Sequence, residues 1–214
     1  MLPRPKRVPP LILVSSLSGP GSRITRGLAE RGATILLGST DPAADAAAIA
    51  PLRAAGLAVS LEPLDLSDPD SITSLATRLN HTHGSLDGLV HAAPMPGILI
   101  DSLITSVVGA AHLTEALSPL LAASGRGRVV FLSSAAASVT APPAGQDAAP
   151  PSVQVAATAL NALTRSYAAS LAPQGIKVNA VCPAGRAQAA IHMALLDDDG
   201  PTGSFTDDVG ELPW

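Results

Sequence analysis

A chain of 214 residues with 47% hydrophobic residues is long enough for one α/β domain with a buried core. Only 2% of the residues are aromatic and the formal net charge is −4, so a basic surface with interleaved aromatic side chains, as nucleic-acid partners require, is not expected. The single cysteine, Cys182, excludes an internal disulfide and fits a reducing compartment, so we expect a cytoplasmic protein.

The first nine residues place basic side chains ahead of the short apolar run LILV. This run is too short for a signal peptide and no small-x-small cleavage site follows it, so we expect residues 1–9 to form a flexible leader. The longest charge-free run, 129–146, is broken by Ser, Thr and Pro, which argues against a membrane span.

Short apolar runs alternate with amphipathic segments along the rest of the chain, a pattern typical of buried parallel strands joined by helices. The predicted strands cover residues 11–16, 33–40, 58–65, 86–93, 127–135 and 176–183. The predicted helices cover residues 22–32, 42–56, 68–84, 99–124 and 153–175, and the third of them opens with acidic capping residues. The pattern predicts an α/β fold over residues 10–189: a doubly wound, Rossmann-like parallel sheet of about six strands, with helices on both faces.

Two segments depart from this alternation. Residues 140–152 form a Pro-rich loop that is long for a connection between a strand and a helix. Residues 190–214 are acidic and contain no convincing strand, so we expect an irregular tail.

The turn after the first predicted strand has the composition of a phosphate-binding turn. Gly19 and Gly21 are small enough to let a pyrophosphate approach backbone N–H groups and the start of the next helix. Two features weaken this prediction: serines, including Ser15 and Ser18, replace any earlier glycine, and Pro20 has no N–H to donate. A plain turn is the alternative interpretation.

The end of the second predicted strand bears on the choice of dinucleotide. An acidic residue here would bind a ribose 2′-hydroxyl, and an arginine would bind a 2′-phosphate. Ser39 and Thr40 are neither, and Asp41 is one or two positions late and is expected to cap the following helix. The missing acid favours NADP over NAD only slightly.

Over residues 10–185 the chain resembles the short-chain dehydrogenase/reductase family. GPGSRITRGLAERGA is similar to the family's glycine turn and first helix, and Asp65 in PLDLSD resembles the aspartate that meets the adenine. LDGLVHAAP resembles the strand that ends in Asn-Asn-Ala-Gly, and GRVVFLSSAAA resembles the strand that carries the catalytic serine. ALNALTRSYAASLAPQGIKVNAVCPAG is the most specific match, and is similar to the segment beyond the catalytic tyrosine and lysine.

The resemblance implies that the chain binds NAD or NADP, with a small-molecule substrate as a further candidate ligand. The residues it implies for cofactor binding are Ser15, Ser18, Gly19, Gly21, Ser39, Thr40, Asp65, Leu66, Ala92, Ala93 and Pro183.

The catalytic positions depart from the family pattern. Alignment on ALNALTR puts Val153 where the tyrosine belongs and Ala157 where the lysine belongs, and the helix-borne asparagine falls on Ser106. Only the serine remains, as Ser134, or Ser133 if the register slips by one. The chain after Pro183 also looks too short for the family's substrate-covering helix and last strand.

Three side chains could be considered for proton transfer. The only tyrosine, Tyr167, lies fourteen residues beyond Val153, roughly 21 Å along a helix, so we expect it to pack or to contact an interface. Ser134 could orient a carbonyl, but an unassisted hydroxyl is a poor acid or base. His91, where Asn-Asn-Ala-Gly has become His-Ala-Ala-Pro, is the candidate replacement acid or base; a buried, hydrogen-bonded histidine is the alternative.

We therefore favour a degenerate family member with a weakened dinucleotide site and without standard hydride transfer, an accessory or inactive oxidoreductase homologue. The alternatives are an NADP-dependent carbonyl reductase, or a non-redox isomerase or cyclase, with a rewired site using Ser134 and His91. A third possibility is a partner protein that forms homo- or hetero-oligomers through its long helices. No cluster of Cys, His or carboxylates has ligand spacing, so no metal site is expected.

Overall fold

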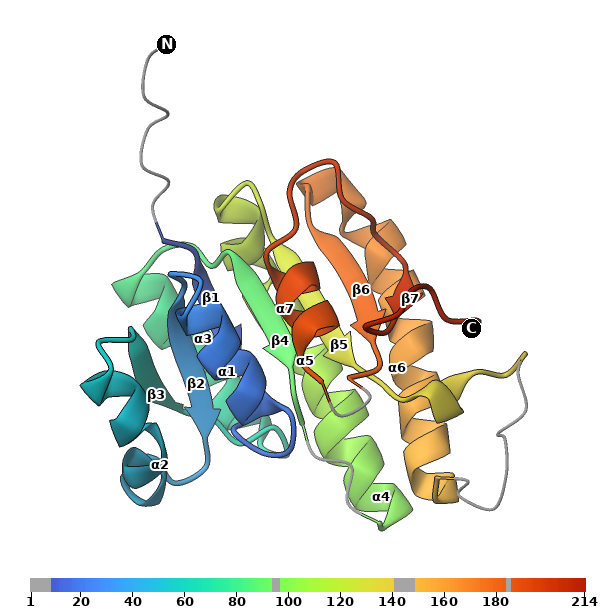
Figure 1. The fold of residues 1–214 in the computed structure, drawn as a ribbon, viewed down its shortest axis with the longest axis horizontal. Coiled ribbons are helices and arrows are strands. Elements are labelled where there is room, and N and C mark those ends of the chain that lie inside the picture. Colours follow the sequence, from blue (N-terminus) through green and yellow to red (C-terminus); the bar gives the residue numbers. More distant parts are fainter. Residues whose placement is uncertain (1–8, 94–96, 141–148, 184–185) are drawn as a thin grey trace.

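A parallel sheet of seven strands runs through the molecule in the order β3-β2-β1-β4-β5-β6-β7 (Figure 1). The computed structural model describes residues 9–93, 97–140, 149–183 and 186–214. The strands are β1 Leu11–Val14, β2 Thr34–Ser39, β3 Val59–Pro63, β4 Gly88–His91, β5 Arg128–Leu132, β6 Lys177–Val181 and β7 Phe205–Thr206. The doubly wound parallel architecture predicted from the sequence is confirmed.

Helices cover both faces of this sheet. The α-helices are α1 Gly21–Ala29, α2 Pro42–Ala54, α3 Pro69–Thr82, α4 Leu99–Ser102, α5 Gly109–Ala123, α6 Pro151–Ser170 and α7 Gln188–Ala194. A π-helical turn, η1 Leu103–Val108, joins α4 to α5, and two 3₁₀ turns are η2 Ala135–Ala137 and η3 Ala172–Gln174. Helices α1, α2 and α7 pack on one face, and α3, α5 and α6 pack on the other.

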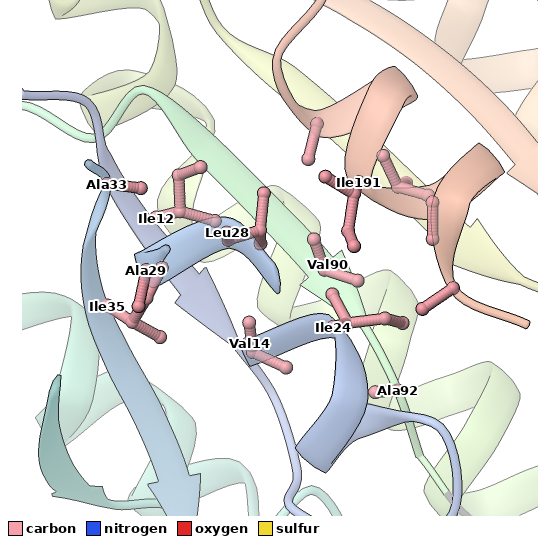
Figure 2. Packing of buried hydrophobic residues seen from close by; sticks show 14 of the residues in the cluster. Ile12, Val14, Ile24, Leu28, Ala29, Ala33, Ile35, Val90, Ala92 and Ile191 are labelled. Atoms are coloured by element: carbon pink, nitrogen blue, oxygen red, sulfur yellow. The ribbon is translucent and has the colours of Figure 1, made fainter. Parts of the chain in front are cut away.

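Alternation along each strand directs side chains into two separate cores. Ile12 and Val14 of β1 face the first core, whereas Leu13 faces the second. Figure 2 shows the first core, in which Ile24 of α1 and Ile191 of α7 lie with Val14 and the other labelled side chains. Because aromatic residues are scarce, both layers are filled almost entirely by aliphatic side chains.

Aspartates open two of the helices, as the sequence indicates. The Asp41 carboxylate accepts hydrogen bonds from the backbone N–H groups of Ala43 and Ala44, and so caps α2. Asp68 accepts from the N–H of Asp70 and caps α3.

The number of strands was underestimated, because a seventh strand lies in the segment expected to be irregular. Phe205 of β7 pairs with Ala180 of β6 and is fully buried, with Trp214 packed beside it at 5.6 Å between ring centroids. A strand of two residues is too short to show an alternation of apolar and polar side chains. Several of the residues around it are acidic, so Phe205 alone did not indicate a strand. Residues 1–8 of the expected leader, and 141–148 of the expected Pro-rich loop, lie outside the described residues.

The segment Leu99–Ala123 is long and apolar enough to cross a membrane by length and composition alone. Its inner side packs on the sheet through Leu113, Leu117 and Leu121, which are fully buried. Core helices pass the same test, so this segment is weak evidence for a membrane span.

The order of the strands reverses between β1 and β4. The chain proceeds outward from β1 to β3 on one side and from β4 to β7 on the other. The crevice beyond the carboxyl ends of the strands at such a reversal is where folds of this type bind ligands.

Candidate functional site

A cavity of about 420 Å³ lies beyond the carboxyl ends of β1, β2 and β3. Six of the predicted cofactor-binding residues line it, namely Ser15, Ser18, Ser39, Thr40, Asp65 and Leu66. Six other lining residues were not predicted from the sequence, namely Ser16, Leu17, Gly38, Asp45, Leu64 and Thr105. The remaining predicted cofactor-binding residues do not line this cavity: Gly19, Gly21, Ala92, Ala93 and Pro183.

Ser15 joins the turn after β1 to the end of β4. Its N–H donates to the carbonyl of Val90 at 2.9 Å, and its hydroxyl oxygen accepts from the N–H of Ala92 at 2.9 Å. A serine at the place of a turn glycine therefore holds β1 and β4 together at the point where the strand order reverses.

Gly21 begins α1 in close contact with the preceding turn. A Cβ atom at this position would lie 2.0 Å from the Ser16 carbonyl oxygen, so only glycine fits without a shift of the backbone. The N–H of Gly21 donates to the carbonyl of Ser18 at 3.0 Å.

The amino terminus of α1 faces the same turn and keeps donors for an anion. The N–H groups of Ser22 and Arg23 donate to no acceptor among the described residues. Because these two amides follow Pro20, the missing proline N–H does not remove them. A helix start with two open N–H groups can accept a phosphate.

The end of β2 presents a carboxylate that the sequence analysis did not assign. The hydroxyl of Ser39, which is buried, donates to Asp45 Oδ2 at 2.6 Å. Asp45 lies in the first turn of α2 and lines the cavity. The sequence did contain a signal for this carboxylate, namely an acidic residue in the first turn of the helix that directly follows β2. The start of that helix lies close to the end of the strand.

Asp65 and Leu66 form the next wall of the cavity. Asp65 Oδ1 accepts from the N–H of Ser67 at 2.8 Å and from its hydroxyl at 2.6 Å, so the carboxylate is held in place. Gly109 at the start of α5 allows the helix to approach this wall, because a Cβ there would lie 2.2 Å from the Leu66 carbonyl oxygen.

His91, the candidate acid or base, is buried at the end of β4 and faces α5. Its Nε2 lies 2.9 Å from Thr114 Oγ1, its ring stacks on Phe131 at 4.7 Å, and Nδ1 has no hydrogen-bond partner. Burial lowers the pKa of the imidazole from 6.5 to about 3, which keeps the ring neutral. His91 does not line the cavity.

The two serines after β5 differ in exposure. Ser133 is buried, with its hydroxyl 2.8 Å from Asn161 Oδ1 and 3.2 Å from the Ala157 carbonyl oxygen. Ser134 is half-buried, and its Oγ accepts from the N–H of Ala136 at 3.2 Å, which caps η2. Of the two, Ser134 has the side chain with more access to solvent.

The other positions implied by the resemblance lie on two helices. Val153 and Ala157 stand near the start of α6, half-buried and fully buried respectively. Ser106 is buried within the π-helical turn η1, a local geometry that often marks functional sites.

Tyr167 and Lys177 are engaged elsewhere. The Tyr167 hydroxyl donates to Glu115 Oε1 at 2.8 Å between α6 and α5, and the ring stacks on Phe131 at 6.3 Å. Lys177 Nζ donates to the Gly200 carbonyl at 2.7 Å. The packing role predicted for Tyr167 is confirmed.

Ala92 is buried in the first core, and the half-buried Ala93 and Pro183 are neighbours of residues outside the described ranges. Within the described residues, no group of three or more His, Cys, Asp or Glu side chains could hold a metal ion.

Comparisons with known proteins agree with this architecture. The family model described as enoyl-(acyl carrier protein) reductase matches residues 14–195. Dehydrogenase/reductase SDR family member 4 of Rattus norvegicus is 31% identical over 183 residues, which cover 80% of this chain and 63% of the rat protein. Cis-4-hydroxycyclohexanecarboxylate dehydrogenase of Sinomonas cyclohexanicum is 32% identical over 212 residues, covering 94% of this chain and 82% of that protein.

Solved structures share the fold. Menthone neomenthol reductase from Mentha piperita superposes with a TM-score of 0.80 at 24% identity, over 94% of this chain and 99% of that one. The NADPH-bound carbonyl reductase from chicken fatty liver gives 0.82 at 19% identity, over 97% of this chain and all of that one. A parallel sheet with this strand order, a cavity beyond the carboxyl ends of its strands and a family match over most of the chain lead to one conclusion: the chain belongs to the short-chain dehydrogenase/reductase family.

Proposed function

We propose that this chain binds a nicotinamide dinucleotide and does not carry out the standard hydride transfer of its family, acting as an accessory or inactive oxidoreductase homologue. The observation that carries the proposal is the start of α6. There the resemblance expects a tyrosine and a lysine near the serine that follows β5, and the chain has Val153 and Ala157.

The dinucleotide half of the site is the better supported half. The N–H groups of Ser22 and Arg23, together with the turn that contains Ser15 and Ser18, would hold the pyrophosphate. The end of β2 would hold the adenosine ribose, and the wall formed by Asp65 and Leu66 would hold the adenine. Gly19, Gly21, Ala92, Ala93 and Pro183 would shape the approach to these residues without lining the cavity.

Among the residues that the structure describes, the chemical half has no tyrosine or lysine where the resemblance expects the proton donor and its partner. When bound, the nicotinamide supplies a hydride, and reduction of a carbonyl then needs a proton for the developing alkoxide. Valine and alanine side chains at positions 153 and 157 carry no such proton. His91 Nε2 lies 2.9 Å from the Thr114 hydroxyl, and Tyr167 lies at the far end of α6 in contact with Glu115. Ser134 retains a hydroxyl, but none of the residues just named provides a base beside it.

The proposal includes a cytoplasmic location and assembly through the long helices. Ile100, Ile104 and Val108 are 60%, 38% and 61% exposed and recur every four residues along α4 and η1. Such a stripe on a helix surface suits contact with a second chain, a copy of this one or a relative. The lean to NADP rests only on Ser39 and Thr40, and the position of Asp45 bears on that choice.

The test combines binding with turnover on the purified chain. We expect NAD⁺ or NADP⁺ to raise the melting temperature, because a ligand at 100 times its Kd stabilises the folded state by about 2.7 kcal/mol. We expect no oxidation of NADH or NADPH above blank with a panel of aldehydes and ketones. Turnover that disappears in Ser134→Ala or His91→Gln would show a rewired enzyme and overturn the proposal.

A further inference from the structure

The charged side chains among the described residues that line the cavity are all negative. Two of its lining residues, Asp45 and Asp65, are acidic, and none of the lining residues within the described part of the chain is Lys, Arg or His. An adenosine with a free 2′-hydroxyl is neutral at that position, whereas a 2′-phosphate brings further negative charge. The cavity therefore provides acceptors for a hydroxyl and no counter-ion for a phosphate.

Asp45 is oriented for such a contact. Ser39 Oγ accepts from the N–H of Asp41 at 3.1 Å and donates to Asp45 Oδ2 at 2.6 Å, so both hydrogen-bonding roles of this serine are filled. Asp45 Oδ1 takes no hydrogen bond from the described residues and remains an open acceptor. The Asp45 carboxylate is thus held through Oδ2, and Oδ1 can accept a hydrogen bond from a ligand.

The N–H groups at the start of α2 could also hold a 2′-phosphate, but Asp41 already accepts hydrogen bonds from two of them. The N–H groups of Ala43 and Ala44 donate to Asp41 Oδ1 at 3.2 and 3.1 Å. Because a carboxylate of the chain itself caps this helix, its first turn offers a phosphate no open amide at these two positions and adds a second negative charge nearby.

We propose that Asp45, held by Ser39, selects NAD(H) over NADP(H) by accepting a hydrogen bond from the ribose 2′-hydroxyl and repelling a 2′-phosphate. The inference rests on the proposed dinucleotide function and reverses the slight preference for NADP that the sequence alone suggests. Asp45 takes the part of an acid at the strand end, although it comes from the first turn of the following helix.

Isothermal titration calorimetry with NAD⁺, NADP⁺, 5′-AMP and adenosine 2′,5′-bisphosphate tests the inference. We expect NAD⁺ to bind about tenfold or more tightly than NADP⁺, and 5′-AMP to bind more tightly than the bisphosphate, since a hydrogen bond to a charged group is worth about this ratio. Asp45→Asn should reduce both ratios by weakening NAD⁺ and tightening NADP⁺. Asp70→Asn, which removes an exposed carboxylate from the first turn of α3, should change neither ratio.

The outcomes separate this inference from the function on which it rests. If NADP⁺ binds the wild-type chain as tightly as NAD⁺, or if Asp45→Asn leaves the ratio unchanged in a protein with a wild-type melting curve, Asp45 does not select the cofactor. The dinucleotide function would survive that result. If neither dinucleotide and neither fragment binds, the proposed function itself is wrong, and the inference is wrong with it.

Discussion

His91 Nε2 lies 2.9 Å from Thr114 Oγ1, and the Thr114 hydroxyl in turn donates to the Ala110 carbonyl at 2.8 Å. Because the threonine proton is directed to that carbonyl, the threonine oxygen acts as acceptor and the proton of the neutral imidazole lies on Nε2. Phe131 covers the ring at 4.7 Å, and Nδ1 is left without a partner. Among the described residues, the two side chains that contact the ring, Thr114 and Phe131, carry no negative charge.

The buried histidine predicts loss of stability in mild acid. Burial lowers its pKa from 6.5 to about 3, so the unfolded chain binds the proton first as the pH falls. The contribution to stability is therefore complete above about pH 6.5 and is lost between that value and pH 3, at roughly 1.4 kcal/mol per pH unit. Urea unfolding at pH 7, 6 and 5 measures this slope.

His91→Gln keeps a donor for Thr114 and removes the titrating ring, so its slope should be smaller by about one proton. Equal slopes for the wild type and His91→Gln would contradict the assigned protonation state.

Tyr167→Phe should reduce stability without affecting the dinucleotide site. The variant loses the 2.8 Å hydrogen bond to Glu115, at a cost of about 1 kcal/mol. Glu115→Gln retains an acceptor oxygen and should be milder. Thermal melts together with NAD⁺ titrations check both effects. A change in NAD⁺ affinity in Tyr167→Phe would contradict the structural role of this side chain.

The two glycines of the turn before α1 should respond differently to alanine. In Gly21→Ala the new Cβ would lie 2.0 Å from the Ser16 carbonyl oxygen, so the turn must move and NAD⁺ affinity should fall. Gly19→Ala meets no atom within 4 Å and costs only the strain of its φ of +54°, about 1–2 kcal/mol. Melting curves and NAD⁺ titrations of the two variants provide the comparison. Equal NAD⁺ affinities would show that this turn does not shape the site.

The ion pair between Arg128 and Asp198 should be asymmetric on substitution. The Arg128 side chain is 4% exposed and also donates to the carbonyls of Gly127 and Leu196, whereas the Asp198 side chain is 84% exposed. Arg128→Met should cost about 1.5–3 kcal/mol through its lost hydrogen bonds. Asp198→Asn should cost less than about 1 kcal/mol, because water solvates the exposed partner. Chemical denaturation of the two variants would measure the difference, and similar costs would contradict it.

The elements with long apolar patterns were predictable from the sequence, and so were their caps. Asp41 and Asp68 open helices where the sequence placed them, because side-chain capping is a local interaction. The role of Asp45 was not predicted, because it depends on how α2 packs against the end of β2. Only that packing brings Asp45 into contact with Ser39. The side chain of His91 has the chemistry of an acid or base. The direction in which its ring points depends on contact with α5, and the local sequence does not specify that contact.

The edge of the sheet at β7 is closed by its own chain. After Thr206 the backbone reverses, so that Thr206 forms an antiparallel bridge with Glu211 and the N–H of Leu212 donates to the Phe205 carbonyl at 2.7 Å. This return covers the outward backbone groups of a strand that is only two residues long. A second molecule therefore finds no open ladder at this edge, which protects the sheet from growing into an intermolecular one and from the aggregation that such growth begins.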